Sequence, residues 1–170
     1  MVGAKFEPRV AVSPQEMRSL FFDTSIMKRL GATATADSRP ANPAANVIDG
    51  DPNTFWLSGG KGAPHPHAIT VHFSAPAAIS GLVLMPRQNH REHEGDIREY
   101  AIQVSDDGTQ WREVKRGELI SSFAPQQVRL PETVTARHLR LTALSGYGTD
   151  PASALAEFAL IHAGPSVSKH

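Results

Sequence analysis

Hydrophobic and polar positions alternate in short runs from residue 32 onward, which is typical of strands with one buried face. In the segment "AITVHF", Ile69, Val71 and Phe73 share one face, whereas Thr70 and His72 point the other way. The segments "EYAIQVS", "QQVRL" and "RHLRLTAL" repeat this alternation. The last run, "ALAEFALIHA", fits a helix and a strand equally well. The pattern therefore predicts a chain built mainly from short strands.

Turn-forming residues separate these strands and indicate how they are joined. The pair Asp107-Gly108 lies between "EYAIQVS" and a second strand that begins near Trp111, and this placement predicts a β-hairpin. No helix of crossover length separates the strands, which disfavours a parallel doubly wound sheet. We therefore expect an all-β fold, an antiparallel β-sandwich.

One helical segment precedes the strands, between residues 13 and 31. Ser13, Pro14 and Glu16 fit an N-cap, a first-turn proline and a capping-box partner. Gly31 supplies a stop signal. We expect one or two short helices that lead into the main domain. The expected division of the chain is a helical lead-in at 1–31, a β-sandwich at 32–163 and a disordered tail at 164–170.

Composition narrows the class of protein. The 170 residues suffice for one domain, and 40% hydrophobic with 20% charged residues is typical of a globular protein. The 17 basic and 17 acidic side chains cancel, which argues against nucleic acid as a partner, because such binders carry a basic excess. Cysteine is absent, so disulfides and thiolate metal sites are excluded. No apolar run approaches the roughly 20 residues of a membrane span, and "MVGAKFEPRV" lacks the features of a secretory signal.

An acidic turn, "NVIDGDPNTFWLSGG", occupies residues 46–60. Asp49, Asp51 and Asn53 stand at the first, third and fifth places, as in an EF-hand loop. That comparison fails, because Thr54 replaces the obligatory glycine and Gly60 replaces the closing glutamate. Oxygen donors for a different calcium site remain, provided that a distant carboxylate completes the shell.

Glu157, in the apolar segment "LAEFAL", is the candidate for that distant ligand. A carboxylate among apolar residues is costly unless it is paired or bound to a cation. The alternative is that Asp49 and Asp51 cap a turn and that Glu157 faces solvent. The residues alone leave both interpretations open.

The histidines and acidic residues show no catalytic pattern. His65 with His67, and His90 with His93, have spacings that zinc sites use, but no third ligand is evident and we disfavour zinc. No serine lies in a nucleophile elbow. A glycosidase needs two carboxylates facing across a cleft, whereas Glu94 and Asp96 lie on one loop. We therefore expect that the chain is not an enzyme.

Several segments, taken in order, resemble a factor V/VIII type C (discoidin) domain, and specifically the branch classed as family 32 carbohydrate-binding modules. The matching segments are "ATADS", "AANVIDGDPNTFW", "PHPHAITVHF", "LVLMPRQ", "GDIREYAIQVSDDGTQW", "VRL", "ARHLRLTAL" and "ALAEFAL". They cover roughly residues 32 to 162, and their order and spacing are more specific than any one of them. The resemblance implies a jelly-roll sandwich of about eight strands, a galactose-binding-domain-like fold.

The resemblance also implies a structural calcium ion without a catalytic role. Side-chain, hydroxyl and main-chain oxygens would supply its ligands, from Asp49, Glu157, Thr54, Asn46, Asp51 and Ala156. The Trp56 side chain would then belong to the core.

For a ligand, the resemblance implies loops at one end of the sandwich that hold a sugar. Arg87 in "MPRQN" matches an arginine that donates to sugar hydroxyls, and Tyr147 between two glycines matches a stacking aromatic ring. The residues that we expect at the ligand are Arg87, Tyr147, Asn89, Glu94 and His65.

The sequence departs from the family at two of the sugar contacts. Leu57 and Ser58 stand where many members carry a histidine, and Glu94 replaces an asparagine. These departures remove part of the galactose-type site. The loop "QNHREHEGD" is either a solvated turn or a source of different contacts, which would come from Asn89, His90, Arg91 and His93.

The function that the resemblance implies is a carbohydrate-binding module, an accessory domain of a larger carbohydrate-active enzyme such as a glycoside hydrolase. Its partner would be a glycan of unspecified sugar and not a membrane. It would be a monomer or part of a multidomain chain, in the extracellular space or the periplasm. The alternative is a structural or protein-interaction discoidin domain that binds no sugar.

Overall fold

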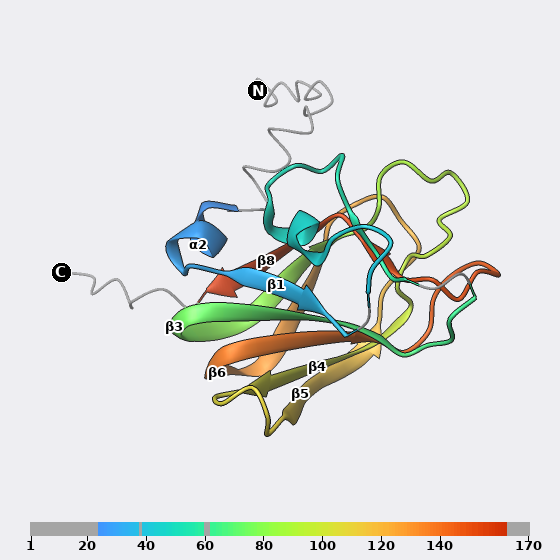
Figure 1. The fold of residues 1–170 in the computed structure, drawn as a ribbon. Coiled ribbons are helices and arrows are strands. Elements are labelled where there is room, and N and C mark those ends of the chain that lie inside the picture. Colours follow the sequence, from blue (N-terminus) through green and yellow to red (C-terminus); the bar gives the residue numbers. More distant parts are fainter. Residues whose placement is uncertain (1–23, 38, 60–61, 163–170) are drawn as a thin grey trace, which may run out of the picture.

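The computed structural model of the chain describes residues 24–37, 39–59 and 62–162 (Figure 1). The short α2 helix (Thr24–Arg29) and the 3₁₀ helix η1 (Ala44–Ile48) are the helical elements in these residues. The strands are β1 (Thr33–Ala36), β2 (Trp56–Leu57), β3 (His67–Met85), β4 (Glu99–Ser105), β5 (Arg112–Glu118), β6 (Gln126–Ala143), β7 (Ala154–Leu155) and β8 (Glu157–His162). The described part is thus mostly strand, as the alternation predicts.

All strand pairings are antiparallel, which confirms the predicted fold class. The larger sheet has the order β1-β3-β6-β4-β5, with β8 pairing to the far half of β3. A second sheet consists of β2 and β7. Strands that are distant in sequence lie side by side, as in a jelly roll, since β1 and β8 both pair with β3.

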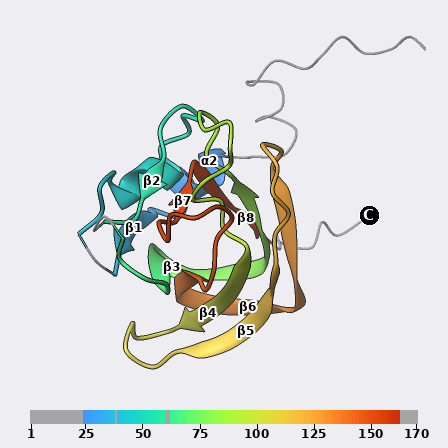
Figure 2. The same cartoon turned by 90° about the vertical axis from the view of Figure 1, so that its right-hand side faces the viewer.

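The two longest strands, β3 and β6, bend together around the core (Figure 2). Their pairing changes register between His72 and Ala77 and again between Ile79 and Gly81. Such irregularities bend a sheet, because an unpaired residue locally increases its twist. The bend lets the first half of β3 pair with β1 while its second half pairs with β8.

The core is formed by the positions that the alternation places on one strand face. Ile69, Val71 and Phe73 are buried, as are Leu139 and Leu141 on the paired strand β6. Trp56 is only 1% exposed, which agrees with its expected place in the core. In β4, Ala101 lies between the core positions Tyr100 and Ile102 in sequence and is nevertheless buried as well. Its small side chain lies on a central strand between Thr142 of β6 and Arg116 of β5.

The β4–β5 hairpin turns at the Asp107-Gly108 pair, as predicted. Gly108 has a φ of 79°, which a residue with a side chain rarely adopts. Asp107 Oδ1 accepts hydrogen bonds from the backbone N–H groups of Thr109 and Gln110, both at 2.8 Å. These bonds favour the ionised carboxylate and therefore lower the pKa of Asp107. The turn is thus closed by its own side chain.

Some of the remaining sequence predictions concern described residues, and others concern residues outside them. Helix α2 ends before Gly31, whose φ of 59° fits the predicted stop. The ambiguous run "ALAEFALIHA" is strand throughout its described part, as β7 and β8. The predicted N-cap at Ser13 and the predicted tail at 164–170 lie outside the described residues. Within the described residues, no helix is long and apolar enough to cross a membrane.

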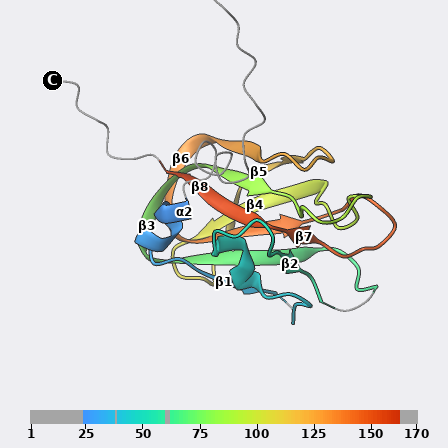
Figure 3. The same cartoon turned by 90° about the horizontal axis from the view of Figure 1, so that it is seen from above.

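Loops gather at the end of the sandwich where β3 finishes and β4 begins (Figure 3). The segments around 57–59, 86–98 and 144–153 meet there and are joined by backbone hydrogen bonds. The Ser58 N–H donates to the Ser153 carbonyl, the Tyr147 N–H to the Asp96 carbonyl, and the Ala154 N–H to the Gly95 carbonyl. This end of the sandwich carries the candidate ligand site.

Candidate functional site

A pocket of about 100 Å³ lies where these loops meet. It is small beside the ~300–1,000 Å³ of typical small-molecule sites, so it suits part of one small ligand unit. The residues that line it are Leu57, Arg87, His90, Glu94, Gly95, Asp150 and Ala152. Two of the five expected ligand residues, Arg87 and Glu94, are thus brought together here.

Arg87 is fixed on two sides. Its guanidinium lies 4.2 Å from the centre of the Phe55 ring, a cation–π contact. Its Nε donates a hydrogen bond of 2.6 Å to Oδ1 of Asn89, the third expected ligand residue. Burial lowers the pKa of Arg87, and the charge of the nearby Asp96 acts in the opposite direction. The N–H groups of its terminal nitrogens have no side-chain partner within the described residues and remain for a ligand.

Glu94 is held by the loop that follows β6. Its Oε1 accepts a hydrogen bond from the hydroxyl of Thr149 at 3.2 Å and lies 3.5 Å from the Thr149 N–H. Gly148 has a φ of 90°, and a Cβ added to it would lie 2.8 Å from Cγ of Glu94. The glycine is therefore required both for the turn and for the position of the glutamate. Together with Asp150, Glu94 gives the pocket two carboxylates against one guanidinium.

A buried carboxylate, that of Asp96, interacts with residues of the pocket loops. Asp96 is 2% exposed, and its Oδ2 lies 3.0 Å from Nδ1 of His93. Burial raises the pKa of Asp96, whereas the His93 hydrogen bond and the charges of His93, His90 and Arg87 oppose that shift. The Asp96 carboxylate thus connects electrostatically to two pocket residues, Arg87 and His90.

Tyr147, the expected stacking ring, is not among the residues that line this pocket. Its hydroxyl donates a hydrogen bond of 2.7 Å to the carbonyl of Leu119, and Arg98 lies 5.9 Å from its ring centre. The flanking glycines do place Tyr147 on a loop, but this contact with the β5–β6 connection holds the ring in half-buried packing.

His65 also lies outside the pocket. Its Nε2 lies 3.2 Å from Oγ of Ser153, and its ring packs against His67 with centroids 4.9 Å apart. Nε2 of His67 is in turn 2.9 Å from the carbonyl of Pro151. These contacts join His65 and His67 to the 144–153 loop. Across the described residues, no group of three or more His, Cys, Asp and Glu side chains is placed to hold a metal.

Three pocket residues were missed by sequence reasoning: Gly95, Asp150 and Ala152. Asp150 was the most accessible of them to prediction, because it lies three residues after Tyr147 in the same glycine-containing loop. Its Oδ1 accepts the N–H of Ala152 at 3.0 Å, which forms an Asx turn between two pocket residues.

The acidic turn after η1 is organised by its own carboxylates. Asp49 Oδ1 accepts the N–H of Asp51 at 2.8 Å, and Asp51 Oδ1 accepts the N–H of Asn53 at 2.9 Å. The Thr54 hydroxyl lies 2.5 Å from Oδ2 of Asp49 and 3.0 Å from the Asp51 carbonyl. Nδ2 of Asn46 donates to the carbonyl of Phe55 at 3.0 Å. Carboxylate, hydroxyl and carbonyl oxygens therefore converge on one turn.

Glu157 is completely buried, so the interpretation in which it faces solvent is wrong. It opens β8 opposite Met85 of β3, and its neighbour Ala156 is also fully buried. Helix η1, which the acidic turn follows directly, packs against β8. Carboxylate, hydroxyl and carbonyl oxygens are the type of ligand that a hard cation such as Ca²⁺ takes.

A larger hollow of about 470 Å³ lies over the outer face of the sheet, near Trp111 and Arg140. The Arg140 guanidinium lies 3.8 Å from the centre of the Trp111 ring. Beside it, the Nδ1 atoms of His72 and His138 are 2.8 Å apart, on directly paired residues of β3 and β6. This face belongs to the sheet and not to the loop end that carries the pocket.

Comparison with known proteins supplies the context for this geometry. The family model described as "F5/8 type C domain" matches residues 31–158. A sialidase of Micromonospora viridifaciens is 37% identical over 129 residues, which are 74% of this chain and 19% of the sialidase. The chain therefore spans about a fifth of that relative's length.

Two solved structures are similar over most of the fold, and both are family 32 carbohydrate-binding modules of Clostridium perfringens. One, from a family 31 glycoside hydrolase, is 30% identical with a TM-score of 0.70, covering 82% of this chain and 94% of that one. The other, from a family 89 glycoside hydrolase, was solved with GalNAc-β-1,3-galactose. It is 27% identical with a TM-score of 0.66, covering 75% of this chain and 92% of the module.

Proposed function

The chain belongs to the F5/8 type C domain family, and from that premise we propose that it is a non-catalytic carbohydrate-binding module. The observation that carries the proposal is the pocket at the loop end, in which Arg87 is held over Phe55 with free N–H donors. A guanidinium with several fixed donors suits two adjacent hydroxyls of one sugar.

The other pocket residues complement such a ligand. The Glu94 and Asp150 carboxylates accept hydrogen bonds from hydroxyls, and Leu57 supplies an apolar wall for a sugar C–H face. Two carboxylates beside one guanidinium disfavour an acidic sugar, because like charges repel at short range. We therefore propose a terminal neutral hexose or N-acetylhexosamine as the unit that enters the pocket.

The pocket lacks the histidine that many family members carry, but other polar residues still line it. Ser58, which stands near that place, is 5% exposed, and its Oγ accepts the N–H of Ser153. It therefore organises two loops rather than facing a ligand. His90 lines the pocket from the 86–98 loop and supplies an imidazole from a different direction.

The module is proposed to serve a larger carbohydrate-active enzyme, such as a glycoside hydrolase, outside the cell or in the periplasm. Support comes from the relatives, of which this chain matches only a small part. A single small pocket implies weak binding, and tethering converts weak binding into a raised local substrate concentration for a neighbouring catalytic domain.

A structural Ca²⁺ is the second part of the proposal. Its ligands would be side-chain or main-chain oxygens of Asp49, Thr54, Glu157, Asn46, Asp51 and Ala156. The full burial of Glu157 and the packing of η1 against β8 support this assignment. The ion would pin the acidic turn to β8 and would supply no chemistry to a bound sugar.

A glycan array of neutral and acidic mono- and oligosaccharides tests the proposed function. We expect the wild-type chain to bind glycans with a neutral terminal sugar and Arg87→Ala to lose them. Arg137→Ala, an exposed arginine outside the pocket, is the matched control and should bind as the wild type does. No binding to any glycan, or binding that Arg87→Ala leaves intact, would overturn the proposal.

A further inference from the structure

The connection between β5 and β6, residues 119–125, carries an unusual pair of exposed apolar side chains. We call this segment the strap. Ile120 is 65% exposed and Phe123 is 40% exposed, and they are the exposed large hydrophobic residues of the described chain. Two exposed apolar side chains close together on one short loop indicate a contact surface more often than two scattered ones do.

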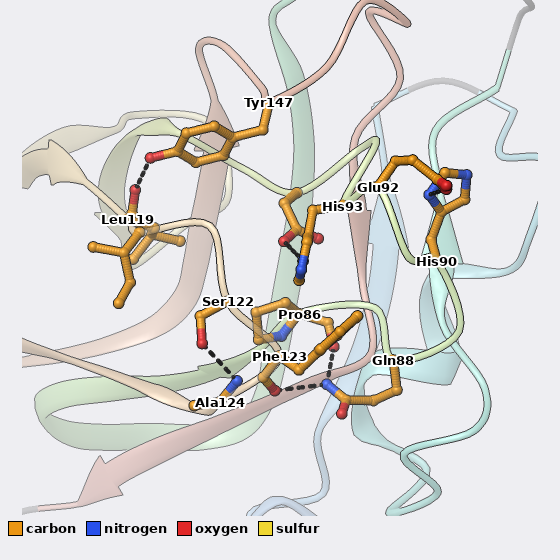
Figure 4. A network of polar contacts seen from close by, with 12 residues as sticks. Pro86, Gln88, His90, Glu92, His93, Leu119, Ser122, Phe123, Ala124 and Tyr147 are labelled. Carbon is orange, nitrogen blue, oxygen red and sulfur yellow. Dashed lines mark hydrogen bonds and ion pairs between the residues drawn. The ribbon is translucent and has the colours of Figure 1, made fainter.

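The strap is held at both ends by hydrogen bonds to its backbone (Figure 4). The Tyr147 hydroxyl donates to the Leu119 carbonyl at 2.7 Å. The side-chain amide of Gln126 bonds to both the N–H and the carbonyl of Ile120, each at 2.9 Å. Nε2 of Gln88 donates to the Phe123 carbonyl at 2.9 Å and to the Pro86 carbonyl at 2.6 Å. Hydrogen bonds from Tyr147, Gln126 and Gln88 therefore hold the backbone of the strap in place.

Phe123 also has a support beneath its ring. The His93 ring packs against it, with centroids 4.1 Å apart and an interplanar angle of 36° (Figure 4). His93 has a positive φ of 57°, rare for a residue with a side chain, and its Nδ1 is 3.0 Å from the buried Asp96 carboxylate. One face of Phe123 is thus fixed on the turn 90–96, while 40% of the residue stays open to solvent.

The same turn lines the pocket on its other side. His90 and Glu94, which flank His93 in sequence, are pocket residues, and the N–H of His93 bonds to the His90 carbonyl. Because the pocket is only about 100 Å³, a glycan whose terminal sugar enters it has to leave over the rim. The strap contacts two residues beside the pocket: Gln88, which follows the pocket residue Arg87, and His93, which precedes the pocket residue Glu94.

From this continuity we infer that the strap is a second subsite, at which the Phe123 ring carries the sugar unit next to the one in the pocket. The inference rests on the proposed function and extends it from a monosaccharide to an oligosaccharide. An aromatic ring that is already fixed loses little entropy on contact with the apolar face of a sugar. The hydroxyl of Ser122, which accepts the Ala124 N–H at 3.0 Å, keeps its own hydrogen to donate to the same unit.

Titration calorimetry of the 170-residue chain with two probes tests the subsite. The probes are N-acetylgalactosamine and GalNAc-β-1,3-galactose, which differ by one sugar unit. We expect the wild type to bind the disaccharide about three- to tenfold more tightly than the monosaccharide, the gain typical of one aromatic contact. Phe123→Ala should reduce disaccharide affinity to the monosaccharide level and leave monosaccharide affinity within about twofold of wild type.

Two further variants separate a ring contact from a general disturbance of the strap. Phe123→Tyr keeps the ring and should bind both probes as the wild type does, and Ile120→Ala removes an apolar side chain from the same strap and should do the same. A disaccharide advantage that survives Phe123→Ala, or that Ile120→Ala removes equally, would overturn this inference and leave the proposed function standing. Absence of binding to both probes by the wild type would contradict the proposed function for this class of sugar, and this inference with it.

Discussion

The Nε of Arg87 donates a hydrogen bond of 2.6 Å to Oδ1 of Asn89, two residues further along the chain. With Phe55 under the guanidinium, this bond fixes the direction in which the remaining N–H groups point. An arginine that is already oriented loses less conformational entropy when a ligand binds. Asn89 therefore acts on a ligand through Arg87, although it does not itself line the pocket.

Asn89→Ala should weaken glycan binding about three- to tenfold, because the guanidinium regains rotamers that binding must remove again. Because Asn89 is exposed, the substitution should change the free energy of unfolding by no more than about 0.5 kcal/mol. Titration calorimetry and thermal unfolding measure the two quantities. Affinity equal to wild type would show that the bond to Asn89 does not orient Arg87.

Gly148→Ala should lower both stability and glycan affinity. The positive φ costs an alanine about 1–2 kcal/mol, and the new Cβ would meet Cγ of Glu94 at 2.8 Å and displace the carboxylate. Gly62→Ala is the matched control, since Gly62 has a φ of 78° and a Cβ there would meet nothing within 4 Å. The control should lose stability while keeping its affinity. Equal affinity in the two variants would argue that the position of Glu94 does not matter for the ligand.

Removal of calcium should lower the melting temperature. A site saturated about a hundredfold above its Kd contributes about 2.7 kcal/mol, which corresponds to about 5–10 °C for a domain of this size. Added Ca²⁺ should restore the loss after chelation, and Asp49→Asn should remove the response. Asp106→Asn, in the exposed β4–β5 turn, is the control and should respond as the wild type does. A melting temperature that neither chelator nor added Ca²⁺ changes would contradict the proposed ion.

Acidification should destabilise the outer face of the sheet at His72. Burial lowers the pKa of His72 below the usual 6.5, and the adjacent His138 lowers it further. The unfolded chain therefore binds a proton at His72 more readily than the folded chain does, so stability is complete above about pH 6.5 and falls as the pH decreases below it. Besides His138, the neighbours of His72 are Thr35, whose hydroxyl is 2.9 Å from Nε2, and the hollow that also contains Arg140.

The check is a comparison of melting temperatures between pH 7.5 and pH 5.5. His72→Gln, which cannot take up a proton, should lose less stability over this interval than the wild type. An identical pH dependence in both proteins would mean that His72 does not contribute to it.

Much of the fold followed from local sequence features. The Asp107-Gly108 turn was predictable because both its φ requirement and its carboxylate–backbone bonds involve residues within the turn. The buried positions of "AITVHF" were predictable because strand alternation fixes which side chains share a face. The bends of β3 and β6 were not, since they depend on register shifts between strands distant in sequence.

The candidate site was less predictable, and Tyr147 shows the reason. Its flanking glycines correctly indicated a loop, but the packing of its ring is decided by the Leu119 carbonyl, 28 residues earlier. Phe123 had no local signal at all, because its role depends on the His93 ring beneath it. Glu157 stayed ambiguous until pairing with β3 placed it in the interior. In each case a contact between distant segments determined the outcome.

The central claim is that a glycan binds through the Arg87 guanidinium in the loop-end pocket, and titration calorimetry with GalNAc-β-1,3-galactose tests it most directly. Deleting charged donors to a bound ligand typically costs 1.5–3 kcal/mol, so Arg87→Ala should weaken binding by about ten- to a hundredfold or more. Arg137→Ala should keep wild-type affinity, and all three proteins should unfold at similar temperatures. Wild-type affinity in a folded Arg87→Ala protein would contradict the claim.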